Sequence, residues 1–285
     1  MTKKTYGVLG HPVAHSLSPA MQNAAFKAAG IDAEYGTYDV APQDLPEFLS
    51  GLSSGKISGL NVTIPHKIKV KEYIRKHGSL DPFAAKLGAV NTIKLSGDGK
   101  LCGYNTDGPG FYRSLVEDLK FEPEGKSVFI LGCGGAASAV AMYLGNGPKR
   151  IFITDIDKAK VGALKEQYLK FYDASRITAI DASDMKKGLD SSDLLVNATP
   201  IGMKDGDPSP VPKEIFHRGL RVYDLVYNAP ATQLVKEANQ EKLHAVTGLG
   251  MLLYQGAISF EIWTDVKAPV AVMRKALREA LKNSV

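Results

Sequence analysis

The chain is poor in cysteine and has no long apolar run, the features that mark disulfide scaffolds, many metal centres and membrane spans. Its 285 residues include only two cysteines, Cys102 and Cys133, which form no Cys-x-x-Cys pair and stand in no cluster with metal-ligand spacing. We therefore expect neither a disulfide framework nor a bound metal. The sequence also has no run of about 18 apolar residues, so no membrane-spanning helix is predicted. These absences favour a reducing, cytoplasmic setting.

Charge of one sign is not concentrated anywhere in the sequence. The net charge is +5, from 35 Lys and Arg against 30 Asp and Glu, and the lysines are scattered. A nucleic-acid-binding face is typically marked by a block of like charge. We expect a small-molecule substrate and no nucleic-acid or membrane partner, while a monomer and a homodimer both stay open.

Strand and helix patterns alternate along the whole chain, which predicts α/β layers with mostly parallel sheets. The chain is long enough for two domains with separate cores. The predicted strands are 5–10, 34–40, 57–64, 89–95, 127–131, 150–154, 176–180, 193–197, 221–226 and 244–247. The predicted helices are 18–29, 43–50, 67–76, 135–145, 157–171, 231–242, 249–263 and 268–283, with another carrying the chain across a domain seam after Asp107.

A glycine turn near the middle of the chain is typical of dinucleotide binding. Residues 127–140 read as an apolar strand, then Gly132-Cys-Gly-Gly-Ala136, then small helix formers. Gly132 suits a tight turn, and Gly134 lets the backbone approach a pyrophosphate. Gly135 and Ala136 would present free N–H groups at the start of a helix. The pattern is incomplete, since the third glycine of Gly-x-Gly-x-x-Gly is missing.

The second strand after the turn ends in an acidic residue. Asp155 lies roughly twenty residues past Gly132, where a carboxylate accepts hydrogen bonds from ribose hydroxyls. This context raises the glycine turn above an ordinary α/β turn without a ligand.

Three loops in the first part of the chain are rich in small polar residues. The first carries Ser16 and Ser18, which suit a carboxylate at a helix start; Ser18 before Pro19 is also expected to cap that helix. His11 and His15 have no evident carboxylate partner in this loop, so we do not expect either to be catalytic. The second loop follows a strand in which Asn61 and Thr63 share one face.

The other candidate residues stand at predicted helix starts. Lys67 opens a helix, where the helix dipole disfavours a cation, so either a function or a solvated surface position explains it. The third loop pairs Asn91 with Asp107, and Asp107 could simply cap the helix that follows.

Taken together, these segments resemble the shikimate dehydrogenase family, including its quinate/shikimate dehydrogenase relatives. The resemblance spans nearly the whole chain. It is carried by the ordered motifs Gly7-Val-Leu-Gly, His15-Ser-Leu-Ser-Pro, Asn61-Val-Thr-Ile-Pro-His-Lys, Gly88-Ala-Val-Asn-Thr, Gly103-Tyr-Asn-Thr-Asp-Gly, Gly132-Cys-Gly-Gly-Ala-Ala, Asn197-Ala-Thr-Pro-Ile-Gly, Asp224-Leu-Val-Tyr-Asn and Gly248-Leu-Gly-Met-Leu-Leu-Tyr-Gln-Gly-Ala.

The resemblance implies a role for each matching position. Lys67 and Asp107 match the catalytic pair, and Ser16 and Ser18 match the serines that hold the substrate carboxylate. The positions that match binders of the ring hydroxyls are Asn61, Thr63, Asn91 and Gln255, and Tyr227 matches a tyrosine that lines the substrate pocket. Thr199, Leu225 and Gly248 match positions near the nicotinamide. The implied reaction is reversible reduction of 3-dehydroshikimate to shikimate.

The sequence departs from the family pattern at the cofactor. NADP-dependent members commonly place Asn-Arg-Thr after the second strand, with the arginine on the 2′-phosphate. This chain has Thr154-Asp-Ile-Asp-Lys158 instead. Asp155 would repel a phosphate and suit free ribose hydroxyls, which favours NAD, although Lys158 and Lys160 keep NADP open.

The resemblance implies a two-domain α/β fold with a cleft between the domains. We expect a substrate-binding catalytic domain over 1–106, with helices of about 253–285 packed back on it, and a Rossmann-type dinucleotide-binding domain over 107–252. Two other hypotheses stay open: an NAD-dependent enzyme that also oxidises quinate, and a non-catalytic dinucleotide sensor, for which an acid/base pair would have no use.

Overall fold

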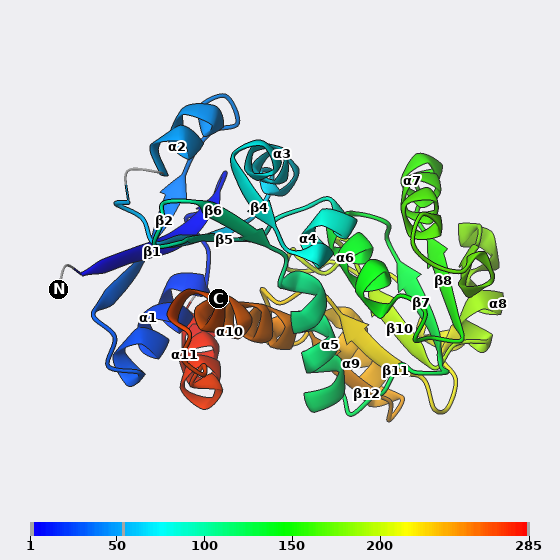
Figure 1. The fold of residues 1–285 in the computed structure, drawn as a ribbon. Helices are drawn as coiled ribbons and strands as arrows, with labels where there is room; N and C mark the ends of the chain where they lie inside the picture. The colour runs from blue at the N-terminus through cyan, green and yellow to red at the C-terminus, as the bar shows by residue number, and fades with distance from the viewer. Residues whose placement is uncertain (1–2, 53–54, 284–285) are drawn as a thin grey trace. The chain divides into compact units, whose positions relative to one another are not determined.

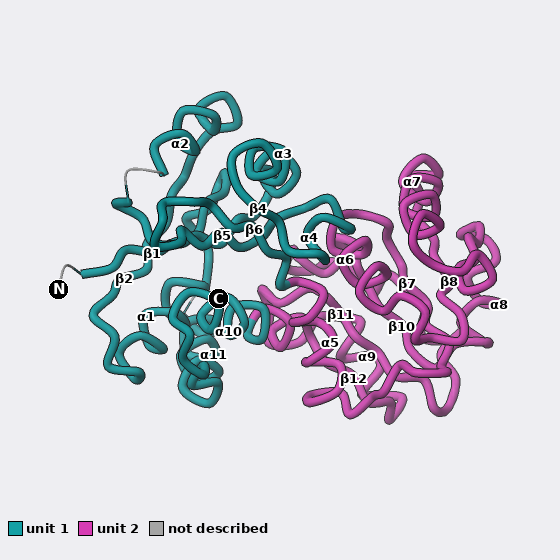
Figure 2. Tube along the Cα trace, in the orientation of Figure 1, with its two compact units in different colours: residues 1–106, 253–285 teal, residues 107–252 magenta. Residues whose placement is uncertain are grey.

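The computed structural model describes residues 3–52 and 55–283, which form two compact units. Unit 1 consists of Met1–Thr106 and Leu253–Val285, and unit 2 consists of Asp107–Leu252 (Figure 2). Each unit is built on a six-stranded sheet with helices packed on it. The predicted two-domain α/β fold class is therefore confirmed.

The sheet of unit 1 is mixed, with the strand order β2-β1-β3-β5-β6-β4. Strands β1 (Lys4–Gly10), β2 (Ala33–Asp39) and β3 (Gly59–Val62) are parallel, as the βαβ pattern predicts. Strands β5 (Thr92–Leu95) and β6 (Leu101–Tyr104) form an antiparallel pair, β5 is antiparallel to β3, and β4 (Gly78–Leu80) is parallel to β6.

Helices cover both faces of this sheet (Figure 1). One face carries α2 (Leu45–Gly51) and α3 (Lys67–His77), and their core includes Leu9, Leu60 and Ile74. The other face carries α1 (Ser18–Ala28), α11 (Val270–Asn283) and α10 (Leu249–Thr264), the last of which enters unit 1 at Leu253. The short α4 (Pro82–Leu87) precedes β5. It begins directly after Asp81, whose carboxylate caps it.

An aromatic cluster holds α10 on the sheet. The Trp263 ring lies 5.1 Å from Tyr6 and 6.0 Å from Tyr35, and its indole N–H donates to the Ile93 carbonyl at 2.9 Å. Rings of this size bury large apolar areas, and a buried indole N–H needs a partner. This contact explains why a helix from the end of the chain belongs to unit 1.

The sheet of unit 2 is parallel throughout, with the order β12-β11-β10-β7-β8-β9. This is the strand order of a dinucleotide-binding fold, in which ligands bind at the carboxyl ends of the central strands. The strands are β7 (Ser127–Leu131), β8 (Arg150–Thr154), β9 (Ile177–Ala179), β10 (Leu194–Asn197), β11 (Arg221–Asp224) and β12 (His244–Thr247). The helices are α5 (Asp107–Glu117), α6 (Gly135–Leu144), α7 (Lys158–Leu169), α8 (Met185–Asp190) and α9 (Gln233–Gln240), with 3-10 turns at Ala174–Arg176, Ala182–Asp184 and Lys213–Ile215.

No helix within residues 3–52 and 55–283 has the length and apolar character that a membrane span requires.

Gly59 allows the close approach between β3 and α10, and this generates a testable prediction. A Cβ at Gly59 would lie 2.5 Å from the Trp263 indole nitrogen and 2.9 Å from the Ile93 carbonyl oxygen. We expect Gly59→Ala to lower the free energy of unfolding by about 1–3 kcal/mol, the usual cost of overpacking a core. Denaturant unfolding measures this. Gly36→Ala on β2 is the matched control, because a Cβ there meets nothing within 4 Å. Equal stability of the two variants would contradict the prediction.

Candidate active site

Two of the predicted polar loops lie side by side at the carboxyl ends of β1 and β3. Thr63 N–H donates to the Leu9 carbonyl at 2.8 Å, and His11 N–H donates to the Ile64 carbonyl at 3.1 Å. The Asn91 carbonyl then accepts from Val62 N–H at 2.7 Å, which adds the third loop. Unit 1 thus brings the three loops together at the carboxyl ends of β1 and β3, where open α/β sheets bind ligands.

The two serines of the first loop are adjacent, but Ser18 does not cap its helix as expected. Helix α1 begins at Ser18 itself, and its N-cap position, Leu17, makes no side-chain cap. Ser18 is thus the first residue of the helix, and its side chain lowers the otherwise raised pKa of the buried Tyr35 hydroxyl. Ser16 Oγ accepts from Ser18 N–H at 3.3 Å. The capping prediction was therefore wrong.

Asn61 and Asn91 lie below the surface in a shared hydrogen-bond network. Asn61 is 5% exposed and Asn91 is 2% exposed. Asn91 Oδ1 accepts from Thr106 N–H at 2.8 Å and from Thr92 Oγ1 at 3.0 Å. Asn61 Nδ2 donates to Thr92 Oγ1 at 3.1 Å. Both amides are thus held in fixed orientations, which is what a binding site for ring hydroxyls requires.

Lys67 opens α3, as the sequence predicted, and is only half-buried. Its carbonyl accepts from Val90 N–H at 3.0 Å, which fixes the helix start beside the Asn91 loop. Asp107 opens α5 in unit 2 and is also half-buried. Since Lys67 and Asp107 belong to different units, their catalytic pairing stays a prediction.

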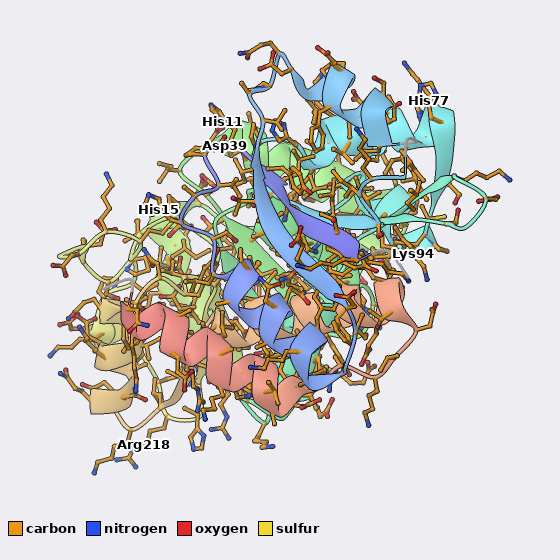
Figure 3. The ribbon with its side chains drawn as sticks, turned by 90° about the vertical axis from the view of Figure 1, so that its left-hand side faces the viewer. His11, His15, Asp39, His77, Lys94 and Arg218 are labelled. Atoms are coloured by element: carbon orange, nitrogen blue, oxygen red, sulfur yellow. The ribbon has the colours of Figure 1, made fainter. Side chains whose placement is uncertain are left out.

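His11 has a carboxylate partner that the sequence did not reveal. Its Nδ1 lies 2.6 Å from Oδ1 of Asp39, and the two side chains are 46% and 47% exposed (Figure 3). The reason given above for excluding His11 was therefore wrong, because the partner lies 28 residues away at the end of the neighbouring strand. An exposed pair of this kind ties the first loop to β2 with at most about 1 kcal/mol of stability.

The glycine turn in unit 2 has the geometry of a phosphate cradle. Gly132 has a φ of 95°, and a Cβ there would lie 2.8 Å from the Ala198 carbonyl oxygen, so only glycine fits. A Cβ at Gly134 or Gly135 would meet nothing within 4 Å. Helix α6 begins at Gly135, so its free N–H groups face this open space, and the turn fits a pyrophosphate.

Asp155 lies against the glycine turn. Its Oδ2 accepts from Cys133 N–H at 2.7 Å and its Oδ1 accepts from Asp157 N–H at 2.9 Å. Next to it, Ile156 is 97% exposed and offers no charge. The two nearby lysines each contact a carboxylate: Lys158 lies 3.1 Å from Asp181, and Lys160 lies 3.8 Å from Asp157.

Cys133 is buried, at 5% exposed, within the glycine turn. Burial, followed by the charge on Asp155, raises the pKa of its thiol to about 12. The reactive thiolate is therefore essentially absent at neutral pH. Among the described residues, no three His, Cys, Asp or Glu side chains group as a metal site requires.

A buried carboxylate organises the remaining predicted cofactor residues. Asp224 accepts from Asn197 Nδ2 at 2.9 Å and from Thr232 Oγ1 at 2.6 Å, and burial raises its pKa. Asn197 Oδ1 in turn accepts from the Thr199 hydroxyl at 2.7 Å. The loops after β10 and β11 are therefore held together at the same sheet edge as the glycine turn.

Leu225 and Gly248 lie in direct contact. A Cβ at Gly248 would be 2.1 Å from the Leu225 carbonyl oxygen, and Gly248 N–H donates to the Val226 carbonyl at 3.0 Å. The glycine at the start of α10 is needed for this close approach of two backbones. The structure thus brings these two predicted cofactor residues together.

Tyr227 and Gln255 lie in different units. Tyr227 is 40% exposed, and the pKa of its hydroxyl is raised by the surrounding protein and then by the charge on Asp107. Tyr227 and Asp107 both belong to unit 2. Gln255 lies on α10 in unit 1 and is 8% exposed.

Four buried hydroxyls of unit 1 were not found from the sequence. Tyr35, Thr92, Thr106 and Ser259 connect Ser18, Asn61 and Asn91. Three of them had a usable signal. Thr92 and Thr106 stand beside Asn91 and Asp107 in the quoted motifs. Ser259 follows Gln255 by four residues and so shares its helix face.

Comparison with known proteins identifies the family. Residues 8–93 match the family model described as the shikimate dehydrogenase substrate binding domain, and residues 248–278 match the shikimate 5'-dehydrogenase C-terminal domain. The chain is 46% identical over 283 residues to a protein of Methanopyrus kandleri named shikimate dehydrogenase (NADP(+)), covering 97% of this chain and 95% of the relative. The chain belongs to the shikimate dehydrogenase family.

Solved structures of the family share the whole fold. A crystal structure of a shikimate dehydrogenase in complex with NADP+ has a TM-score of 0.90 and 40% identity, and covers 97% of this chain and 95% of that one. The Listeria monocytogenes shikimate 5-dehydrogenase in complex with shikimate and NAD has a TM-score of 0.88 and 32% identity, and covers 96% of both chains.

A family relative with another substrate is equally similar in fold. The quinate dehydrogenase of Corynebacterium glutamicum, in complex with NAD, has a TM-score of 0.89 and 28% identity, and covers 97% of this chain and 99% of that one. Fold similarity alone therefore does not separate shikimate from quinate as a substrate.

The exposed His11–Asp39 pair generates a prediction. We expect His11→Asn to change kcat by less than about 3-fold, because the exposed pair only ties the first loop to β2 with at most about 1 kcal/mol. Loss of a general acid or base would instead cost roughly 100-fold or more. Steady-state rates measure this, and Asp39→Asn serves as the partner variant. A loss approaching 100-fold in both variants would instead make the pair part of the catalytic machinery.

Proposed function

We propose that this protein catalyses the reversible, nicotinamide-dependent reduction of 3-dehydroshikimate to shikimate. The observation that carries the proposal is the set of loops at the carboxyl ends of β1 and β3 in unit 1, which carry one lysine and several neutral polar side chains. These side chains are Ser16, Ser18, Asn61, Thr63, Lys67 and Asn91. Together they provide hydroxyls and amides for a carboxylate and ring hydroxyls, and one cation for a carbonyl oxygen.

The polar side chains would orient the substrate. Ser16 and Ser18 would hold its carboxylate at the start of α1, where N–H groups and the helix dipole favour an anion. Asn61, Thr63, Asn91 and Gln255 would bind its ring hydroxyls. Such a set fixes the position of the reacting carbon, which is the main contribution of binding residues to catalysis.

Lys67 and Asp107 would act as the acid/base pair. Negative charge develops on the ketone oxygen during reduction, and a cation or proton donor about 3 Å away stabilises it. The ammonium group of Lys67 supplies either. Asp107 would orient Lys67 and bind a neighbouring hydroxyl, and Tyr227 near Asp107 would line the pocket. A close Lys–Asp pair titrates as a unit.

Unit 2 would hold the dinucleotide, which supplies the hydride when bound. Gly132, Gly134, Gly135 and Ala136 would receive the pyrophosphate at the start of α6. Thr199, Leu225 and Gly248 would line the nicotinamide end, and Asp155 would accept hydrogen bonds from the ribose.

We infer a preference for NAD over NADP, although the Methanopyrus relative is named for NADP(+). The Asp155 carboxylate next to the glycine turn would repel a 2′-phosphate, and the exposed Ile156 offers it no charge. Lys158 and Lys160 already contact Asp181 and Asp157. Exposed pairs of this kind are weak, so Asp155 and Ile156 carry the inference.

Two other functions have specific support. A quinate/shikimate dehydrogenase would agree with the inferred preference for NAD and with the similarity to the quinate dehydrogenase of Corynebacterium glutamicum. A non-catalytic sensor would also explain the cradle and the polar sheet edge, but it has no need for both Lys67 and Asp107.

We expect the enzyme to work on small molecules in the cytoplasm, as a monomer or homodimer.

Replacement of Lys67 tests the proposed reaction. We expect Lys67→Ala to lower kcat by roughly 100-fold or more, with a smaller effect on KM, because general acid/base catalysis has this magnitude. The rate of absorbance change at 340 nm with shikimate measures it. Lys69→Ala, also on α3, is the matched control, since Lys69 is exposed and lies 3.8 Å from Glu72. Near-normal kcat in Lys67→Ala would refute the assignment.

Introducing the missing arginine tests the cofactor inference. We expect Ile156→Arg to raise the ratio of kcat/KM for NADP to that for NAD by about 10-fold, since hydrogen bonds to charged groups contribute roughly 1.5–3 kcal/mol. Leu169→Arg, on an exposed site at the far end of α7, adds the same charge away from the turn. A wild-type enzyme that strongly prefers NADP would refute the role given to Asp155.

A further inference from the structure

The side-chain amide of Asn61 is held from both ends inside unit 1. Its Oδ1 accepts from the Tyr35 hydroxyl at 2.8 Å, and its Nδ2 donates to the Ser259 hydroxyl at 2.9 Å. Its 5% exposure leaves little room for water to replace either partner. An amide with both ends bonded cannot rotate without leaving a buried polar group unpaired.

Tyr35 joins two predicted substrate residues without reaching the surface. It is 3% exposed, and burial raises the pKa of its hydroxyl well above the usual value, so the group is neutral at physiological pH. Interaction with the Ser18 side chain offsets part of this rise in the pKa. The Tyr35 backbone is fixed by Asn23, whose side chain bonds its carbonyl at 2.9 Å and its N–H at 2.8 Å. The Tyr35 side chain is therefore held in one position between the first loop and β3.

Ser259 joins the strands to the helix that carries Gln255. Its hydroxyl is completely buried and donates to the Gln255 carbonyl at 2.9 Å, one helical turn earlier. It also lies 2.8 Å from Thr92 Oγ1, which donates to Asn91 Oδ1. A single hydroxyl thus links β3, β5 and α10.

We propose that Tyr35 and Ser259 are positioning residues for the substrate, which act on its ring hydroxyls through Asn61. This inference rests on the proposed function. Neither residue needs to touch the substrate, because both are buried and hydrogen-bonded to Asn61. Removing the Tyr35 hydroxyl takes away the bond to Asn61 Oδ1, and removing the Ser259 hydroxyl takes away the shortest of the three bonds made by Nδ2, at 2.9 Å against 3.1 and 3.3 Å. Either change loosens the amide, and small losses of alignment in supporting groups are costly to binding.

The test compares Tyr35→Phe and Ser259→Ala with wild type for shikimate and for the dinucleotide. We expect the KM for shikimate to rise about tenfold in each variant, since one buried hydrogen bond contributes roughly that factor. The KM for the dinucleotide should stay unchanged, because unit 2 carries the cradle. A merely structural role would not move the two KM values apart.

Tyr6→Phe is the matched control for Tyr35→Phe. Tyr6 lies directly opposite Tyr35 in the β1–β2 register, is equally buried and packs on the same Trp263. Its hydroxyl bonds to Ser58 rather than to Asn61. Thr264→Val is the control for Ser259→Ala, since the Thr264 hydroxyl also donates to a carbonyl of α10, at 2.8 Å, but does not meet Asn61. Both controls should keep the wild-type KM for shikimate.

Substrate analogues decide whether Asn61 transmits the effect. With 4-deoxyshikimate and 5-deoxyshikimate, the rise in KM caused by Tyr35→Phe should shrink for the analogue that lacks the hydroxyl bound by Asn61. An unchanged KM for shikimate in both variants, an equal rise in Tyr6→Phe, or the same rise for all three substrates would overturn the inference while leaving the proposed function intact. If the wild-type protein does not oxidise shikimate, the proposed function fails and this inference fails with it.

Discussion

Asn61 depends on partners from three separate segments of the chain, and the polar network of unit 1 depends on Asn61. A primary amide with 5% exposure must satisfy its carbonyl and its NH2 group inside the protein, or the site loses stability. Tyr35, Asn91, Thr92 and Ser259 provide those bonds from β2, from the loop after α4 together with β5, and from α10. The network therefore requires the last helices of the chain to pack on the first unit. Trp263 reinforces this, since its N–H bonds the Ile93 carbonyl on β5.

In unit 2, too, a buried polar residue fixes the loops at the carboxyl ends of the strands. Asp224, completely buried, holds Asn197 and Thr232, so that the loops after β10 and β11 have one arrangement. Asp155 holds the glycine turn from the neighbouring strand through Cys133 N–H. In both units, a buried polar residue at a strand end fixes a loop that cannot be fixed by apolar packing alone. The loops that would bind ligands are thereby held before any ligand arrives.

Much of this arrangement was predictable from the sequence where the signal is local. Strands β7, β8 and β12 begin and end as predicted because apolar runs stop at glycine or polar residues. Strands β4 and β6 were missed because Gly78-Ser-Leu and Leu101-Cys-Gly-Tyr are too short and too glycine-rich to show alternation. Helix α8 was missed for a related reason, since six residues with a central Gly188 give no helical period. The contacts between distant segments could not be predicted. Asn61 and Ser259 are 198 residues apart, and the sequence around one residue gives no sign that the other lies beside it.

The proposed reaction, oxidation of shikimate, needs both the polar residues of unit 1 and the cradle of unit 2. Initial rates of the wild-type protein on shikimate and quinate, each with NAD and NADP, test it most directly. The account predicts the highest kcat/KM for shikimate with NAD. Binding of shikimate and dinucleotide without any change in absorbance at 340 nm would contradict it and support a sensor, and a higher kcat/KM for quinate would make the protein a quinate dehydrogenase.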